Sequence, residues 1–163
     1  MTTLSPVSQS FTNKDIGPKH KSRRRLSREL ALKGIYQWRM VGGTASFIED
    51  QLREDDAFIK ADVKYFSNLL RGVLDQFEIL RHKIQPCLDR SFDELSPIEF
   101  SILLLSTYEL DSHPEIPYRA VINEGIELAR SYGGTDGYKY INGVLDKLAA
   151  QMRVVEIGAQ AKS

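Results

Sequence analysis

A run of basic side chains near the N-terminus is the feature of this sequence with the clearest chemical use. Residues 1–28 hold seven basic residues against one acidic residue, a net charge of +6, and the remaining 135 residues hold 15 basic and 21 acidic residues, a net charge of −6. An acidic body with a concentrated basic segment is suited to binding a polyanion at one place. A solvated tail would show the same pattern, so charge alone leaves both interpretations open. The basic residues are Lys14, Lys19, Lys21, Arg23, Arg24, Arg25 and Arg28.

A second group, Tyr138, Lys139 and Tyr140, combines aromatic rings with a cation. Proteins bind single-stranded RNA by stacking unpaired bases on aromatic rings while cations hold the backbone. The alternative is that one tyrosine belongs to the core and the other to an ordinary surface, since residues two apart face different sides of a helix. Asp136 precedes the group and is expected first of all to cap the helix that carries it.

Catalytic and metal-binding patterns are missing from the sequence. His20, His82 and His113 lie far apart, and none has a second ligand at metal-binding spacing. His82 and Cys87 are separated by Pro86 and give no nucleophile–base arrangement. We therefore expect a non-catalytic protein without metal or cofactor, whose function lies in its surfaces.

The composition fits one globular domain. The chain has 163 residues, 42% of them hydrophobic and 27% charged, which excludes a disordered or collagen-like chain. A single cysteine and the lack of a signal-like N-terminus indicate a cytoplasmic location. No apolar run approaches the roughly 18 residues that a membrane span needs, so we expect no membrane contact.

The spacing of apolar residues predicts an all-α fold of six or seven helices. Residues 1–22 are expected to form a disordered extension, 23–152 the helical domain, and 153–163 a flexible tail. Ser96-Pro97-Ile98-Glu99 has the form of a capping box, with Ser96 as N-cap and Glu99 reaching back. The expected helices run from about residue 26 to before Gly42, within 44–52, and over 60–85, 97–110, 118–132 and 136–152, with an acidic solvated connection at 49–56 and a brief turn or short helix at 89–95.

Asn123 and Asn142 stand in the middle of two of these helices. Because asparagine is a weak helix former, we expect both to make buried hydrogen bonds between helices. Gly34 and Gly125 also lie inside helices, at a cost of about 1 kcal/mol unless close packing requires them.

Three stretches carry a resemblance to a known family. They are RRRLSRELALKGIYQW (23–38), SPIEFSILLLSTYEL (96–110) and IPYRAVINEGIELARSYGGTDGYKYINGVLDKLA (116–149). Together they resemble the NusB family of bacterial transcription antitermination factors over nearly all of residues 23–152. The resemblance implies two packed helical bundles, the first three helices against the rest.

The resemblance also implies a function. Members of the family bind the single-stranded boxA element of nascent ribosomal-RNA transcripts jointly with NusE, a small-subunit ribosomal protein, within an RNA polymerase antitermination complex. Some relatives form homodimers. A NusB-like domain also occurs attached to RNA cytosine methyltransferases, but only 11 residues follow the last expected helix, so we expect no catalytic domain. An alternative from another class is a protein-interaction or dimerisation module whose basic segment is incidental.

The resemblance assigns roles to particular residues. Arg24, Arg25 and Arg28 match the boxA-binding basic helix, and arginine offers phosphate a planar fork of donors. Tyr140 matches an aromatic residue at the RNA surface. Asp136 matches an aspartate close to RNA that weakens binding.

For the protein partner, the resemblance implies that Tyr36 and Glu99 contact NusE. Cys87 stands where some relatives carry a tyrosine near the RNA, so a contact there remains open. Trp38 continues the apolar stripe of its helix and is expected in the core.

Overall fold

The structure, a computed structural model, describes residues 21–161, and all regular secondary structure in that range is helical, with no strand in it. Residues 1–20, most of the expected extension, lie outside the described residues. The α-helices are α2 (Arg23–Val41), α3 (Ala45–Leu52), α4 (Ala57–Lys60), α5 (Val63–Asp75), α6 (Phe77–Ile84), α7 (Pro97–Ser112), α8 (Tyr118–Tyr132), α9 (Gly137–Met152) and α10 (Val154–Ala161), with 3-10 turns η1 (Gln85–Cys87) and η2 (Phe92–Glu94) between α6 and α7. The all-α prediction is confirmed.

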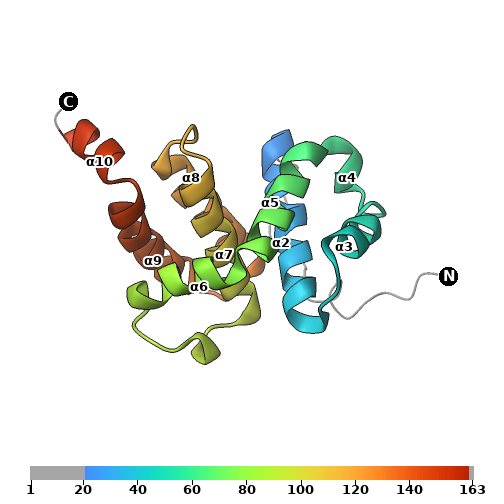
Figure 1. Ribbon diagram of the computed structural model, residues 1–163, viewed down its shortest axis with the longest axis horizontal. Coiled ribbons are helices and arrows are strands. Elements are labelled where there is room, and N and C mark those ends of the chain that lie inside the picture. Colours follow the sequence, from blue (N-terminus) through green and yellow to red (C-terminus); the bar gives the residue numbers. More distant parts are fainter. Residues whose placement is uncertain (1–20, 162–163) are drawn as a thin grey trace.

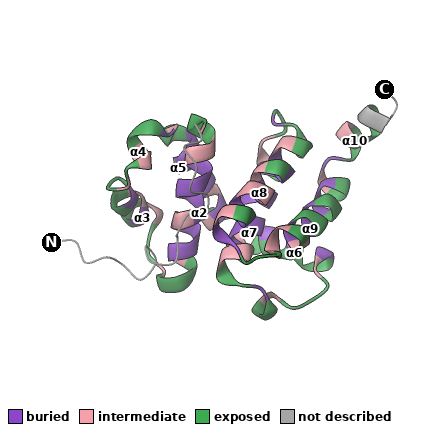
Figure 2. Cartoon of the chain, turned by 180° about the vertical axis from the view of Figure 1, so that it is seen from behind, coloured by how far each residue is buried: buried purple, intermediate pink, exposed green. Residues whose placement is uncertain are grey.

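The helices form two bundles that share one hydrophobic core (Figure 1). The first contains α2 to α5, and the second contains α6 to α9 with α10 at its end. Helices α2 and α5 both pack against α7, so α7 joins the two bundles. In Figure 2 the buried residues concentrate where α2, α5 and α7 meet, while α3, α4 and α10 show mostly exposed or intermediate residues.

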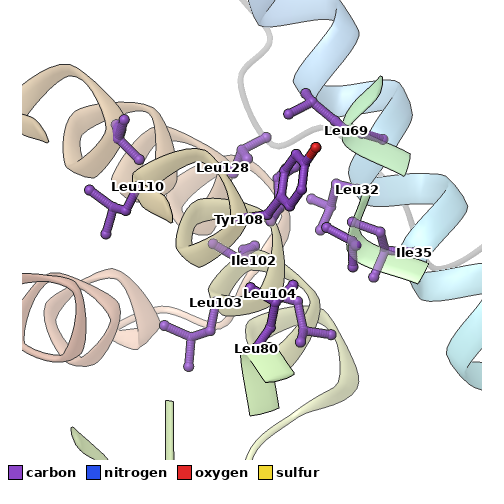
Figure 3. Packing of buried hydrophobic residues seen from close by; sticks show 14 of the residues in the cluster. Leu32, Ile35, Leu69, Leu80, Ile102, Leu103, Leu104, Tyr108, Leu110 and Leu128 are labelled. Atoms are coloured by element: carbon purple, nitrogen blue, oxygen red, sulfur yellow. The ribbon is translucent and has the colours of Figure 1, made fainter. Parts of the chain in front are cut away.

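Helix α7 is buried on every side from Phe100 to Leu110, as expected for a central helix that is apolar on more than one face. Leu32, Ile35 and Leu69 of the first bundle approach it from one side, and Leu80 and Leu128 of the second bundle lie on others (Figure 3). Its start follows the predicted cap: the Glu99 N–H donates to Ser96 Oγ at 3.1 Å, and the Ser96 hydroxyl donates to Glu99 Oε1 at 3.0 Å. Ser96 therefore caps α7 and fixes where it begins, while Glu99 reaches back to the Ser96 hydroxyl and not to the backbone N–H that a complete capping box uses.

The structure divides the helix expected over 60–85. Helix α5 ends at Asp75 and α6 begins at Phe77, because Gln76 has a non-helical backbone at φ −106° and ψ 18°. The regular spacing of buried apolar residues continues across this break, since Val73 before it and Leu80 after it are both fully buried. This spacing depends only on which face of the chain is buried, so it gives no sign that the helix axis changes direction at Gln76. The break sends α6 from the first bundle into the second, where it packs on α7 and α9.

Close helix packing accounts for two glycines. A Cβ at Gly34 would lie 2.9 Å from Leu70 Cδ1, and a Cβ at Gly125 would lie 2.8 Å from both Ser106 Oγ and Leu145 Cδ1. Both contacts are tighter than van der Waals packing allows, so α2 and α8 approach their neighbours only because these positions lack a side chain.

The C-terminal end differs from the expected flexible tail. Residues 154–161 form α10, and Arg153, only 6% exposed, anchors its start. The Arg153 guanidinium donates to the carbonyl oxygens of Leu110, His113 and Ile116 at 2.8 to 2.9 Å, and it pairs with Glu156 at 2.6 Å. One arginine thus binds the carbonyl groups at the end of α7 and in the following loop. The spacing of residues in the sequence does not indicate this role.

The acidic stretch 49–56 is also more ordered than a solvated connection. Its first residue, Glu49, belongs to α3 and pairs with Arg71 at 2.9 Å. Asp55 pairs with Lys33 at 2.7 Å. These ion pairs hold α3 and the turn after it against α5 and α2.

Candidate nucleic-acid interface

The N-terminal end of α2 carries the basic segment. Ser22 caps this helix, its Oγ accepting the Arg25 N–H at 3.1 Å. Arg24 is exposed, with its guanidinium 4.4 Å from the centre of the Tyr65 ring. Arg25 is partly exposed and pairs with Glu124 of α8 at 3.1 Å. Both guanidinium groups are therefore within reach of a ligand in solution.

Arg28 lies in a different environment from Arg24 and Arg25. Its side chain is buried, and it donates to Glu109 of α7 through Nε at 2.8 Å and Nη2 at 2.9 Å. The Tyr65 hydroxyl donates to the same carboxylate. Burial alone would lower the pKa of Arg28, but the hydrogen bonds and charge of Glu109 outweigh it and raise that pKa above its ordinary value. The expectation that Arg28 contacts phosphate is therefore revised, because its guanidinium is already bound inside the protein.

Two carboxylates organise the basic segment, and sequence analysis gave neither of them this role. Glu109 is 1% exposed and lies between the buried residues Tyr108 and Leu110, and Glu124 pairs with both Arg25 and Arg28, at 3.1 and 3.5 Å. An acidic residue within a buried stretch of helix is the signal that points to a buried partner.

A small pocket opens between the start of α2 and α8. Lys21, Arg25, Glu124, Glu127 and Ser131 are among the residues that line it. Lys21 also pairs with Glu29 at 2.6 Å. The carboxylates around this pocket balance much of the positive charge of the basic segment in the free protein.

The start of α9 carries the second group. Lys139 and Asp136 are well exposed and lie 3.5 Å apart as an ion pair. Asp136 is the N-cap residue by position, but its side chain makes no capping hydrogen bond. The expected cap is therefore wrong, and the carboxylate points to Lys139 instead of the helix backbone.

Both tyrosines of this group are partly buried and each has an arginine on its ring. The Arg130 guanidinium lies 4.6 Å from the Tyr138 ring centre, and the Arg90 guanidinium lies 4.0 Å from that of Tyr140. Burial raises the pKa of Tyr140, and the nearby carboxylate of Asp89 contributes to this. Sequence analysis missed both arginines, which come from α8 and from the turn before η2.

The two groups lie at different ends of α7. Glu109, near the end of α7, holds the basic segment, whereas Glu99, in the first turn, lies beside α9, where a Cβ on Gly137 would be 3.3 Å from its Cδ. Ten residues separate these glutamates, which corresponds to about 15 Å along the helix axis. A ligand that contacts both groups must therefore be extended.

The residues assigned to the protein partner are placed as follows. Tyr36 lies on α2 and is buried, with only 9% of its surface exposed, whereas Glu99 is partly exposed. Trp38 is partly buried and packs edge-on against Phe77, with ring centres 5.1 Å apart, as expected for a core residue.

The structure also places Asn123, Asn142 and Cys87. Asn123 and Asn142 are both exposed, so the predicted buried hydrogen bonds between helices are wrong. At these two positions the low helix propensity of asparagine is therefore not a sign of a buried hydrogen-bond partner. Cys87 is 2% exposed, so its side chain offers little surface to a ligand.

Within residues 21–161, no three or more His, Cys, Asp or Glu side chains gather in a way that could hold a metal ion. No helix in that range is long and apolar enough to cross a bilayer.

Comparison with known proteins identifies relatives of the chain. The sequence model of the NusB family matches residues 25–150. The transcription antitermination protein NusB of Nitrosospira multiformis is 65% identical over 82% of this chain and 84% of its own length, and that of Nitrosomonas europaea is 62% identical over 95% and 90%.

Solved structures agree with the sequence comparison. NusB from T. maritima superimposes with a TM-score of 0.68 at 27% identity, over 81% of this chain and 94% of that one. The antitermination factor NusB, solved with NusE and double-stranded RNA, has the same fold, with a TM-score of 0.63 at 22% identity over 78% of this chain and 96% of that one.

Proposed function

The chain belongs to the NusB family of transcription antitermination proteins, and from that premise we propose that it binds single-stranded boxA-type RNA of nascent ribosomal transcripts jointly with NusE. The protein then works within an antitermination complex on RNA polymerase. It acts in the cytoplasm as a binding protein, without catalysis, metal or cofactor. The NusB–NusE–RNA structure supports this proposal by analogy of fold.

The observation that carries the proposal is the exposure of Arg24 and Arg25 in the first turn of α2. Positive side chains at a helix N-terminus oppose the helix dipole, so their placement there costs stability. Binding of phosphate groups would offset that cost. When RNA binds, a phosphate group replaces the Glu124 carboxylate as the partner of Arg25.

The other residues of the two groups have complementary roles. Arg28 positions α2 through its pair with Glu109 and does not contact RNA. Tyr138 and Tyr140 offer ring faces to unpaired bases, and Lys139 holds the backbone. Asp136 is well exposed beside Lys139, and its negative charge repels phosphate and lowers RNA affinity.

NusE binds an adjoining surface, around Tyr36 and Glu99. The ring of Tyr36 supplies apolar contact and the carboxylate of Glu99 a hydrogen-bond acceptor. Joint binding raises the affinity of each ligand by the same factor, because coupling between two sites is reciprocal.

Binding to a short boxA RNA, measured with and without NusE across a salt series, tests the proposal. For single strands, log K falls with log salt by about 0.7 per neutralised phosphate. We expect Arg24→Ala/Arg25→Ala to reduce this slope by more than about one unit, which corresponds to two lost phosphate contacts. The matched control is Arg53→Ala/Arg71→Ala, which removes two exposed arginines near α3 and should leave the slope unchanged.

A second variant tests the role of Asp136. Because its side chain makes no capping bond, Asp136→Asn should bind the RNA more tightly at low salt without loss of stability. Weak, sequence-blind binding by the wild type, unaffected by NusE and by the Arg24/Arg25 change, would refute the RNA function. It would favour a protein-interaction or dimerisation module, which sedimentation of the free protein would reveal.

A further inference from the structure

The C-terminal half of α2 holds an arginine in an unusual setting. The Arg39 guanidinium lies 5.0 Å from the centre of the Phe77 ring and 4.9 Å from that of Phe100. These rings come from the first residue of α6 and the first turn of α7. Three helices therefore fix the position of one exposed cation.

Arg39 has no carboxylate partner within residues 21–161. Arg81 on the same side offers a contrast, because it also lies over a ring, that of Phe92 at 4.9 Å, but it pairs with Glu78 at 3.9 Å. Arginine carries five N–H donors in a rigid planar fork. Stacking on ring faces leaves the donors at the edge of the guanidinium unused and aims them at solvent.

The position of Arg39 connects the two residues assigned to the protein partner. Arg39 follows Tyr36 by three residues, so the two lie on one side of α2. Phe100, which holds Arg39, directly follows Glu99. In Figure 1 the end of α2 and the segment leading from η2 to α7 lie on the same lower side of the molecule.

Exposed apolar side chains follow Arg39 along the chain, at the end of α2 and the start of α3. Met40 is 52% exposed, Val41 66% and Phe47 55%, and Phe47 Cδ1 would be 3.7 Å from a Cβ on Gly43, just after α2. Aromatic residues, methionine and arginine are the residue types enriched at protein interfaces. Protein is favoured over RNA here, because Glu78 and Glu99 offset the charges of Arg39 and Arg81 and leave no excess of positive charge for a polyanion.

We propose that Arg39 binds a carboxylate of the protein partner, at the centre of a surface formed by Arg39, Met40 and Glu99 beside the small exposed edge of Tyr36. This inference rests on the proposed joint binding with NusE and names the chemistry of that contact. The guanidinium donates two parallel N–H bonds to the two oxygens of an aspartate or glutamate. The rings hold the fork in place before the partner arrives, so little rotamer entropy is lost on binding.

The affinity of the full-length protein for NusE of the same organism, measured by titration calorimetry, tests this inference. Arg39→Ala should weaken binding roughly 10-fold or more, as expected for a central interface arginine. Arg39→Gln keeps a polar stem over the rings and should weaken binding similarly, and Arg39→Lys should restore little because lysine lacks the planar fork. The matched control, Arg81→Ala, should stay within about twofold of the wild type, as expected for a paired surface charge.

The outcomes separate this inference from the function on which it rests. If the wild type binds NusE and the Arg39 variants bind equally well, the carboxylate contact is refuted while the proposed function stands. If the wild type does not bind NusE, both fail. If Arg39→Gln instead loses affinity for RNA in the absence of NusE, Arg39 belongs to the RNA surface and the inference is overturned. Circular dichroism of each variant establishes that it is folded.

Discussion

Arg28→Met removes the positive half of a buried ion pair and leaves its carboxylate in place. In the wild type, Glu109 accepts three hydrogen bonds from Arg28, at 2.8, 2.9 and 3.1 Å, and one from the Tyr65 hydroxyl. Methionine fills much of the arginine stem, so the change creates little empty space. Glu109, 1% exposed, is then left as a buried charge with a single hydrogen-bond donor.

The expected loss follows from this geometry. Removing one partner of a buried pair costs about 3–5 kcal/mol, because the remaining charge is uncompensated. With a urea m-value of about 2 kcal/mol/M, the unfolding midpoint should fall by roughly 1.5–2.5 M. Arg25→Met, one turn away, breaks the more exposed pair with Glu124 and should cost at most about 1 kcal/mol.

Urea titration at pH 7, followed by far-ultraviolet circular dichroism, measures both variants. The double variant Arg28→Met/Glu109→Leu replaces the pair by apolar side chains and should recover most of the lost stability, since such replacements are often neutral or stabilising. The reasoning is refuted if Arg28→Met unfolds within about 1 kcal/mol of Arg25→Met, or if the double variant is no more stable than Arg28→Met alone.

Three further measurements test other parts of the structure. A Cβ at Gly72 would overlap the ring of Tyr108, so Gly72→Ala should lower the free energy of unfolding by about 1–3 kcal/mol in a urea titration; an unchanged midpoint would contradict the packing of α5 on α7. Burial alone would raise the pKa of Asp55, but its hydrogen bonds, above all that from Lys33, lower it below the ordinary value of 3.8. The stability contributed by Asp55 is therefore present above that pH and is lost as the pH falls through the depressed pKa, so Asp55→Asn should show a shallower decline in acid-series titrations than the wild type. Burial raises the pKa of the Cys87 thiol, so a disulfide reagent at pH 8 should modify it slowly in the native protein and at once in urea; rapid native reaction would mean that this thiol is accessible.

The sequence predicted those parts of the fold that have local signals. The bounds of α8 match the expected 118–132, because proline precedes this helix and a glycine pair follows it. The start of α7 followed from Ser96 as its N-cap and Pro97 as its first residue. The break at Gln76 has no glycine or proline to mark it, and both sides of the break bury the same apolar stripe. The position of this break is therefore set by the packing of α6 against the second bundle, which depends on residues far away in the sequence.

The candidate site shows the same limit. Sequence analysis found the basic run but could not tell which arginine of α2 is buried, because its partner Glu109 lies 81 residues away. The rings of Tyr138 and Tyr140 were found, whereas the arginines that stack on them come from other elements. Asn123 and Asn142 misled for the opposite reason: a residue type that is unusual inside a helix can simply face solvent.

The unbroken course of α2 has a consequence for how two ligands share this protein. Arg25 and Arg39 are 14 residues apart on one straight element, which sets them about 21 Å apart along its axis. On the proposed function, RNA holds one end of this rod and the protein partner the other. A preassembled complex of RNA and partner then binds two sites that α2 holds at a fixed distance. The avidity of that complex depends on whether its two contact points are the same distance apart. One residue inserted near the middle of α2 would change the spacing by only about 1.5 Å but would turn one end by roughly 100° relative to the other. The same turn would move half of the buried face of α2, which holds Leu32 and Ile35, out of the core, so the packing of this helix fixes the span between the two ends.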